Sequence, residues 1–376
     1  MPAYHQMGFN SMALVREERL QNYMGLIVSP VNCPDDECGK IMEYCFDSLH
    51  EVIFDPQMYN PSSPQRNMRA WSYFPDDFES ADKTNLAYWS SVVDGVIKCC
   101  VDHDCDGVCS PAFLPRKYTS GYYALITDIF EEMQKSLPGG KDLYLTLVLH
   151  FDDLVVDDVG DIADLVTGRD VENVYLVLSS EVPPKEHLTN EDALVAVMKL
   201  INILSNNGIK VLVSNCSLDI VLWKVAGAHS GATGQHGNLR RFSSSRWDAP
   251  VSGPRIQKPY IIEEAFLANV SDADFVRLDV DDLASAATLS NEFYVDLKEA
   301  IRDKGHVLAL SWRFYLYWFM DFISRCEADA DEAEEAVLLA RRNWRDHGED
   351  LILDDPKNDG VWVSRWLRAI RTFKKL

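Results

Sequence analysis

The sequence contains four candidates for acid–base chemistry, each placed directly after a short apolar run of the kind that forms a strand. They are Asp55, His150, Asp152 and Glu263. A carboxylate or an imidazole in a cleft can take up or deliver a proton, and a carboxylate can also act as a nucleophile. Together they predict a hydrolase or a transferase, for instance one acting at a glycosidic (ribosyl) bond, because a carboxylate stabilises oxocarbenium-like charge.

Local sequence favours Asp55 and the pair His150 and Asp152. Asp55 precedes Pro56, which biases its backbone towards an extended conformation, although an aspartate before a proline also commonly opens a turn. Side chains two residues apart on an extended chain point to the same side, so His150 and Asp152 could share a proton or a metal ion. The alternative is that Asp152 only begins the solvated acidic loop that runs to Asp161.

A glycine-rich turn that carries two arginines is the candidate phosphate-binding element. Glycines let backbone N–H groups approach a ligand, and fixed positive charge beside them is what an anion needs. The glycine spacing matches neither the Walker A nor the Rossmann fingerprint. The alternative is a mobile loop whose arginines pair with surplus acids. The residues expected to bind the ligand are Gly231, Thr233, Gly234, Asn238, Arg240 and Arg241, with Asn215 and Glu181 from neighbouring strand ends.

Strand-like and helix-like segments alternate over most of the chain and must position these residues. The alternation predicts a parallel sheet, and eight units match a closed (β/α)8 barrel of the TIM type. An open doubly wound parallel sheet is the alternative, and either fold places the site at the strand C-termini. The expected strands are 25–29, 51–54, 108–110, 143–149, 173–178, 210–214, 228–233 and 260–263.

Three segments are expected along the chain. They are an N-terminal leader at 1–24, the barrel at 25–282 and a helical extension packed on it at 283–376. The longest apolar run, Val307 to Ile323, is interrupted by Arg313 and Asp321, which favours a buried helix over a membrane span. The start lacks the apolar core of a signal peptide and the cysteine count of nine is odd, so thiols in a reducing cytoplasm are expected.

The chain is strongly acidic, with 59 acidic and 36 basic residues and a formal net charge of −23. Nucleic-acid binding is therefore not expected, except through a local patch of Arg240, Arg241 and Arg246. The expected partner is a phosphorylated small molecule or a nucleotide. No cofactor is firmly implied, although a divalent metal stays open, and the cysteines between Cys99 and Cys109 lack the spacing of paired zinc knuckles.

A binding or assembly subunit is the alternative to an enzyme. The aromatic loop 58–78, whose length is typical of a lid or a binding wall, and the C-terminal helices would then dock a protein partner or a second copy of the chain. The expected anchors are Trp71, Tyr73, Phe74, Trp362 and Trp366. No family motif is recognised, and a barrel fold does not by itself fix function.

Overall fold

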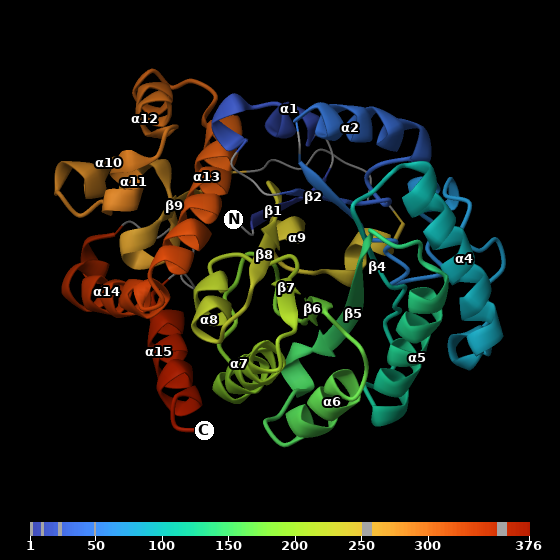
Figure 1. Cartoon of the computed structure of the whole chain (residues 1–376). Coiled ribbons are helices and arrows are strands. Elements are labelled where there is room, and N and C mark those ends of the chain that lie inside the picture. The colour runs from blue at the N-terminus through green and yellow to red at the C-terminus, as the bar shows by residue number, and fades with distance from the viewer. Residues whose placement is uncertain (1–2, 9–10, 22–24, 49, 250–257, 352–358) are drawn as a thin grey trace.

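Eight parallel strands close into a barrel in the computed structural model, which describes residues 3–8, 11–21, 25–48, 50–249, 258–351 and 359–376 (Figure 1). The strands are β1 (Ala3–Gln6), β2 (Gly25–Val28), β3 (Glu51–Phe54), β4 (Gly107–Cys109), β5 (Asp142–His150), β6 (Asn173–Ser179), β7 (Lys210–Val213) and β8 (Ser230–Thr233). Each strand pairs with its sequence neighbours, and β8 returns to pair with β1. The TIM-type barrel is confirmed, and the open doubly wound sheet is excluded.

The barrel begins and ends earlier in the chain than the sequence indicated. Residues 3–6, expected in a leader, are wholly buried as β1. The run expected as the last strand instead contains β9 (Ile261–Glu263), which pairs antiparallel with β10 (Ala268–Val270) outside the barrel. Both expectations were wrong because burial between neighbours outweighs intrinsic strand preference, which is weak for Ala-Tyr-His-Gln and strong for Ile-Ile.

The longest ladder of the barrel joins β5 to β6. It runs over seven residue pairs, from Tyr144 opposite Asn173 to His150 opposite Ser179. Residues 144–149 are all buried, because one face of the strand points into the barrel and the other is covered by helices. The register brings His150 and Ser179 side by side at the C-terminal edge.

Helices follow the strands along the chain, and most of them form a ring outside the barrel, whereas the short α9 lies inside that ring in this view (Figure 1). They are α1 (Met12–Val15), α2 (Asp35–Ser48), α3 (Arg66–Arg69), α4 (Leu86–Asp102), α5 (Ser120–Ser136), α6 (Asp158–Thr167), α7 (Glu191–Asn206), α8 (Ile220–Val225) and α9 (Gly237–Arg240). Three of the longer ones begin at a polar residue whose side chain accepts a hydrogen bond from the first turn, namely Asn85, Thr119 and Asn190. Such N-caps fix where the helix starts.

The C-terminal part of the chain is helical after β10. It comprises α10 (Asp272–Val280), α11 (Ala286–Ser290), α12 (Tyr294–Arg302), α13 (Val307–Ala328), α14 (Glu332–His347) and α15 (Val361–Phe373). The long apolar helix α13 packs against β1 and β8, as the prediction of a buried helix required. A Cβ at Gly231 of β8 would lie 3.1 Å from Phe319 Cζ, so this glycine allows the close contact. Among the described residues no helix has the length and apolar character needed to cross a bilayer.

Removing residues 1–7 is expected to abolish cooperative folding, because β2 and β8 would each lose a partner strand and the barrel would gain two open edges. Circular dichroism during thermal unfolding would measure the loss. Removing residues 374–376, which follow α15, is the matched control and should change Tm by less than about 2 °C. Wild-type cooperativity in the first truncation would show that β1 is not required for closure.

Candidate functional site

The carboxylate of Asp55 lies inside the barrel at the C-terminal end of β3, and the residue is only 3% exposed. It accepts hydrogen bonds from the Gln57 backbone N–H at 3.0 Å and from the Tyr59 hydroxyl at 3.2 Å. The Tyr175 hydroxyl lies 3.3 Å from Asp55 Oδ2 and 3.0 Å from Gln6 Oε1, so its proton can serve either. These contacts join β1, β3 and β6 across the barrel interior.

Arg246 supplies positive charge beside this carboxylate. It lies in the 3-10 helix η4 (Ser244–Trp247) and is buried, with its guanidinium donating to Ser29 Oγ at 3.0 Å. Gln57 Nε2 donates to the same oxygen at 2.7 Å. In the described part of the chain no ion pair within 4.0 Å joins Arg246 to Asp55. The two charges therefore attract each other at longer range, and neither is neutralised by direct contact.

Burial sets the protonation of both groups. Desolvation raises the pKa of Asp55 from its ordinary value of 3.8 to about 6, and the hydrogen bonds and the charge of Arg246 oppose this rise only in part. Desolvation also lowers the pKa of Arg246 to about 10, against the attraction of Asp55. A carboxyl group with a pKa of about 6 changes its protonation near neutral pH, which is what a proton-transfer group needs.

The loop between β3 and α4 covers this site. Ser63 Oγ donates to the Trp247 carbonyl at 2.7 Å, and Gln65 Nε2 donates to the Arg246 carbonyl at 3.1 Å. The Tyr59 ring packs edge-on against Trp247, with centroids 5.1 Å apart. The first part of the loop expected as a lid thus lies against η4, next to the buried carboxylate.

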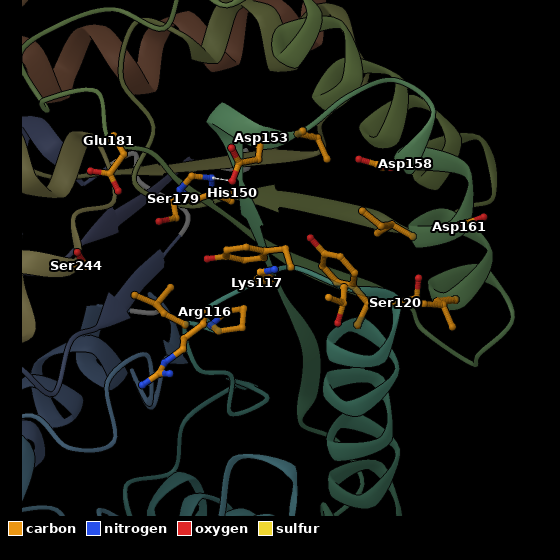
Figure 2. Close-up of a pocket in the computed structure, with 18 residues that line it drawn as sticks. Arg116, Lys117, Ser120, His150, Asp153, Asp158, Asp161, Ser179, Glu181 and Ser244 are labelled. Atoms are coloured by element: carbon orange, nitrogen blue, oxygen red, sulfur yellow. Dashed lines mark ion pairs between the residues drawn. The ribbon is translucent and has the colours of Figure 1, made fainter. Parts of the chain in front are cut away.

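His150 lines a separate, open cleft at the ends of β5 and β6 (Figure 2). The cleft has a volume of about 790 Å³ and lies between the loop before α5, the 3-10 helix η3 (Phe151–Asp153) and α6. His150 Nδ1 is 3.0 Å from Asp153 Oδ2, although the two do not have the geometry of a hydrogen bond. The Tyr118 ring lies 5.5 Å from the imidazole. The sequence-predicted residue Glu181 also lines this cleft.

The structure does not bring His150 and Asp152 together. Asp152 accepts hydrogen bonds from Ser180 Oγ at 3.0 Å and from the Glu181 backbone N–H at 2.7 Å, so it anchors the turn after β6. The carboxylate beside the imidazole is that of Asp153 instead. The reason is that the extended chain ends at His150, and the alternation of side chains does not continue into η3.

The donors of Arg240 are used within its own turn. Its Nε donates to the Gly234 carbonyl at 3.0 Å and its Nη2 to the Gln235 carbonyl at 3.1 Å. The guanidinium carbon lies 3.4 Å from the centre of the Tyr315 ring. Two of the five N–H donors of the guanidinium are thus held by the turn, and the anion-binding role of Arg240 stays a prediction.

The other members of the predicted phosphate loop are packed or point elsewhere. A Cβ at Gly234 would lie 2.6 Å from Leu239 Cβ, so this glycine serves close packing rather than ligand approach. Thr233 Oγ1 is 2.8 Å from the Tyr315 hydroxyl. Asn215 donates weakly to the Leu239 carbonyl at 3.4 Å, and Asn238 is exposed in a helix too short to offer an N-terminal site.

Arg241 is buried among acids rather than open to an anion. It is 4% exposed, and its Nε and Nη1 have no hydrogen-bond partner among the described residues. Burial lowers its pKa, against the attraction of Asp219, Asp152 and Glu186. These acids attract the guanidinium from beyond ion-pair distance, since no carboxylate of the described residues lies within 4.0 Å of it, and their negative charge opposes the binding of an added anion.

Glu263 lies outside the barrel, so its predicted place at the mouth is corrected. Its Oε1 accepts from the backbone N–H groups of Ala265 at 2.9 Å and Ser285 at 3.0 Å. Its Oε2 accepts from Thr288 Oγ1 at 2.8 Å. This fully buried carboxylate holds the chain before α11, a structural task.

Sequence reasoning missed three residues of the Asp55 site, namely Tyr59, Tyr175 and Gln6. Of these, the sequence indicated Tyr175 alone, because it is the one tyrosine in the otherwise aliphatic run of β6, where an inward polar group is unusual. Arg246 was considered only for nucleic-acid contact. Asp153 and Ser179 of the cleft were passed over in favour of their neighbours, because one position along a strand or turn reverses the side a residue faces.

The aromatic residues expected as docking anchors are all buried within the chain. They are Trp71, Tyr73, Phe74, Trp362 and Trp366. Trp366 Nε1 donates to the Leu188 carbonyl at 2.7 Å, which attaches α15 to the chain before α7. The nine cysteines are buried thiols, and the residues that the structure describes contain no group of three or more His, Cys, Asp or Glu arranged to hold a metal.

No protein-family model and no curated protein matches the chain. Among solved structures it is similar to dihydrodipicolinate synthase from Oceanobacillus iheyensis, at 10% identity over 98% of this chain and 96% of that one, with a TM-score of 0.36. It is also similar to a chitinase from Rhizomucor miehei (9% identity, 57% and 68% covered, TM-score 0.37). A third is a mandelate racemase/muconate lactonizing protein from Paracoccus denitrificans (9%, 64% and 56%, TM-score 0.31). Similarity this low carries nothing about activity.

The substitution Asp55→Asn is expected to stabilise the protein more at pH 8 than at pH 4. Because the folded-state pKa is raised from 3.8 to about 6, the wild type loses stability as pH rises through this window. Above it, the buried charge costs about 3 kcal/mol, which asparagine does not carry. Urea unfolding of both proteins at pH 4, 6 and 8 measures the difference. If the difference in unfolding free energy between the two proteins stays constant with pH, Asp55 is not desolvated. Substitution of the exposed Asp102 by asparagine is the control.

Proposed function

We propose that the chain is a barrel enzyme that uses the Asp55 carboxylate to hydrolyse, or transfer at, a glycosidic bond such as a ribosyl bond. The observation that supports this is a carboxylate buried inside the barrel between two tyrosine hydroxyls, with the buried cation Arg246 beside it. Active sites of such barrels form at the C-terminal ends of the strands, where Asp55 lies.

The protonation of Asp55 gives it two uses in such a reaction. Ionised, it would stabilise the positive charge that develops on the sugar carbon, or attack that carbon. Protonated, it would deliver its proton to the leaving atom. A pKa of about 6 populates both forms near neutral pH, and the hydrogen bonds from Tyr59 and Tyr175 keep the carboxylate in one orientation.

Arg246 would bind the anionic part of the substrate, and a phosphorylated small molecule or a nucleotide is the substrate class we propose. Two donors of Arg240 are bonded to carbonyls and Arg241 is attracted by three acids, whereas Arg246 donates, among the described residues, only to the neutral hydroxyl of Ser29. Its charge is therefore the one best placed to pair with a phosphate once the covering loop opens.

Asp55→Asn is expected to lower kcat by at least about 100-fold, because it removes the group that exchanges the proton or charge. The assay would incubate the protein with a panel of nucleosides, nucleotides and 4-nitrophenyl glycosides and follow release of base or nitrophenol. Glu263→Gln, a buried carboxylate outside the barrel, is the matched control and should keep kcat if its Tm shows that it folds. Equal turnover by Asp55→Asn and wild type would remove Asp55 from the mechanism.

Arg246→Met is expected to abolish the thermal stabilisation that a phosphorylated ligand gives, whereas Arg240→Met should keep it. A ligand at 100 times its Kd stabilises the native state by about 2.7 kcal/mol, which differential scanning fluorimetry resolves. Each variant is compared with its own ligand-free melting curve, so any loss of intrinsic stability cancels. Loss of the shift in Arg240→Met alone would return the anion site to the glycine-rich turn.

A further inference from the structure

The cleft that His150 lines lies beside the Asp55 site, since Ser244 of η4 is part of its lining. The backbone of Phe242 bridges to Ser179 of the cleft, while its ring packs edge-on against Tyr59, with centroids 5.0 Å apart. Along β6, Ser179 lies four residues beyond Tyr175, which corresponds to about 13 Å. Neither Asp55 nor Arg246 is part of the lining, so the chemistry proposed at Asp55 does not account for the residues that line this cleft.

The cleft has the volume and the mixed apolar and polar lining of a small-molecule binding pocket. Its volume of about 790 Å³ falls within the range of small-molecule pockets. Part of the lining is apolar and would take the body of an organic molecule. These residues are Leu114, Tyr123, Leu154, Ile162 and Leu165.

Carboxylates outnumber basic side chains on the polar part of the lining. The acids are Asp153, Asp158, Asp161 and Glu181, and the bases are Arg116 and Lys117. Figure 2 shows the acids on η3, α6 and the loop after β6, with both bases on the loop before α5. The chain as a whole carries a formal charge of −23, and a cleft with low-dielectric walls concentrates such a field. The field therefore favours a cation.

Two of these acids are available to a ligand. Asp153 Oδ2 is 3.0 Å from His150 Nδ1, whereas Oδ1 has no partner among the described residues, and the side chain is 81% exposed. The carboxylate of Glu181 likewise has no partner among the described residues, where only its backbone N–H is engaged, with Asp152. A ligand ammonium could donate a hydrogen bond to either carboxylate.

We propose that this cleft binds an organic amine, with the ammonium at Asp153 and Glu181 and an apolar body against Leu154 and Ile162. The site is distinct from the proposed function, because it uses neither Asp55 nor Arg246 and prefers the opposite charge.

The test is calorimetric titration of the full chain with three probes that share one skeleton, 4-phenylbutylamine, 4-phenylbutan-1-ol and 4-phenylbutanoate. The amine is expected to bind at least about tenfold more tightly than the alcohol, and the carboxylate most weakly. Asp153→Asn/Glu181→Gln should weaken amine binding by at least about tenfold. Raising the salt concentration should weaken the amine more than the alcohol.

Asp102→Asn/Glu132→Gln is the matched control, because it removes the same charge from positions on α4 and α5 that do not line the cleft. It should change the amine Kd by less than about twofold. Equal loss in both double variants would assign the preference to net charge and overturn the site, as would equal binding of all three probes. Preferred binding of the carboxylate, lost in Arg116→Ala/Lys117→Ala, would also overturn it. Asp55→Asn should bind the amine like wild type, which keeps this proposal separable from the proposed function.

Discussion

Hydrogen bonding between β1 and β8 closes the barrel, and the position of every functional group depends on that closure. A closed sheet leaves each strand with two partners, so the strand ends form a ring and cannot slide past one another. Asp55, Tyr175 and Gln6 come from three different strands and meet only because the ring holds them in register. The helix α13 adds support by packing against both closing strands.

Two charged side chains are buried inside this ring, and their burial costs the fold stability. An aspartate and an arginine are buried near each other without a direct ion pair, and desolvation moves the pKa of both towards the neutral form. Burying an ionised group costs stability unless it is fully paired. Glu263, another buried carboxylate, also accepts hydrogen bonds from three groups, but it lies outside the barrel, where it holds the chain before α11. The position of Asp55 inside the barrel at the end of a strand, with the buried cation Arg246 nearby, is what marks it as the candidate reactive carboxylate.

The sequence predicted the fold class and the edge of the barrel at which polar residues gather, because apolar periodicity and strand ends are local properties. Asp55 and His150 were found in this way. It could not predict which strands close the barrel, since residues 3–6 have little strand preference and are buried only by distant neighbours.

The glycine-rich turn illustrates a second limit of prediction from sequence. Gly234 is small because Leu239 packs against it, and Arg240 is bonded to carbonyls that lie five and six residues earlier. Such uses of glycine and arginine look the same in sequence as a ligand site.

The contact between residues 3–6 and 230–233 also has a consequence for synthesis on the ribosome. At about 5–20 residues per second, roughly 10–50 s pass between the emergence of the two strands. During that time β1 can pair with β2 on one side only, and its other side is an open edge able to pair with another nascent chain. An edge of four residues that includes His5 and Gln6 is a poor template for such pairing. The same weak strand character that hides β1 in the sequence therefore protects the unfinished barrel from aggregation.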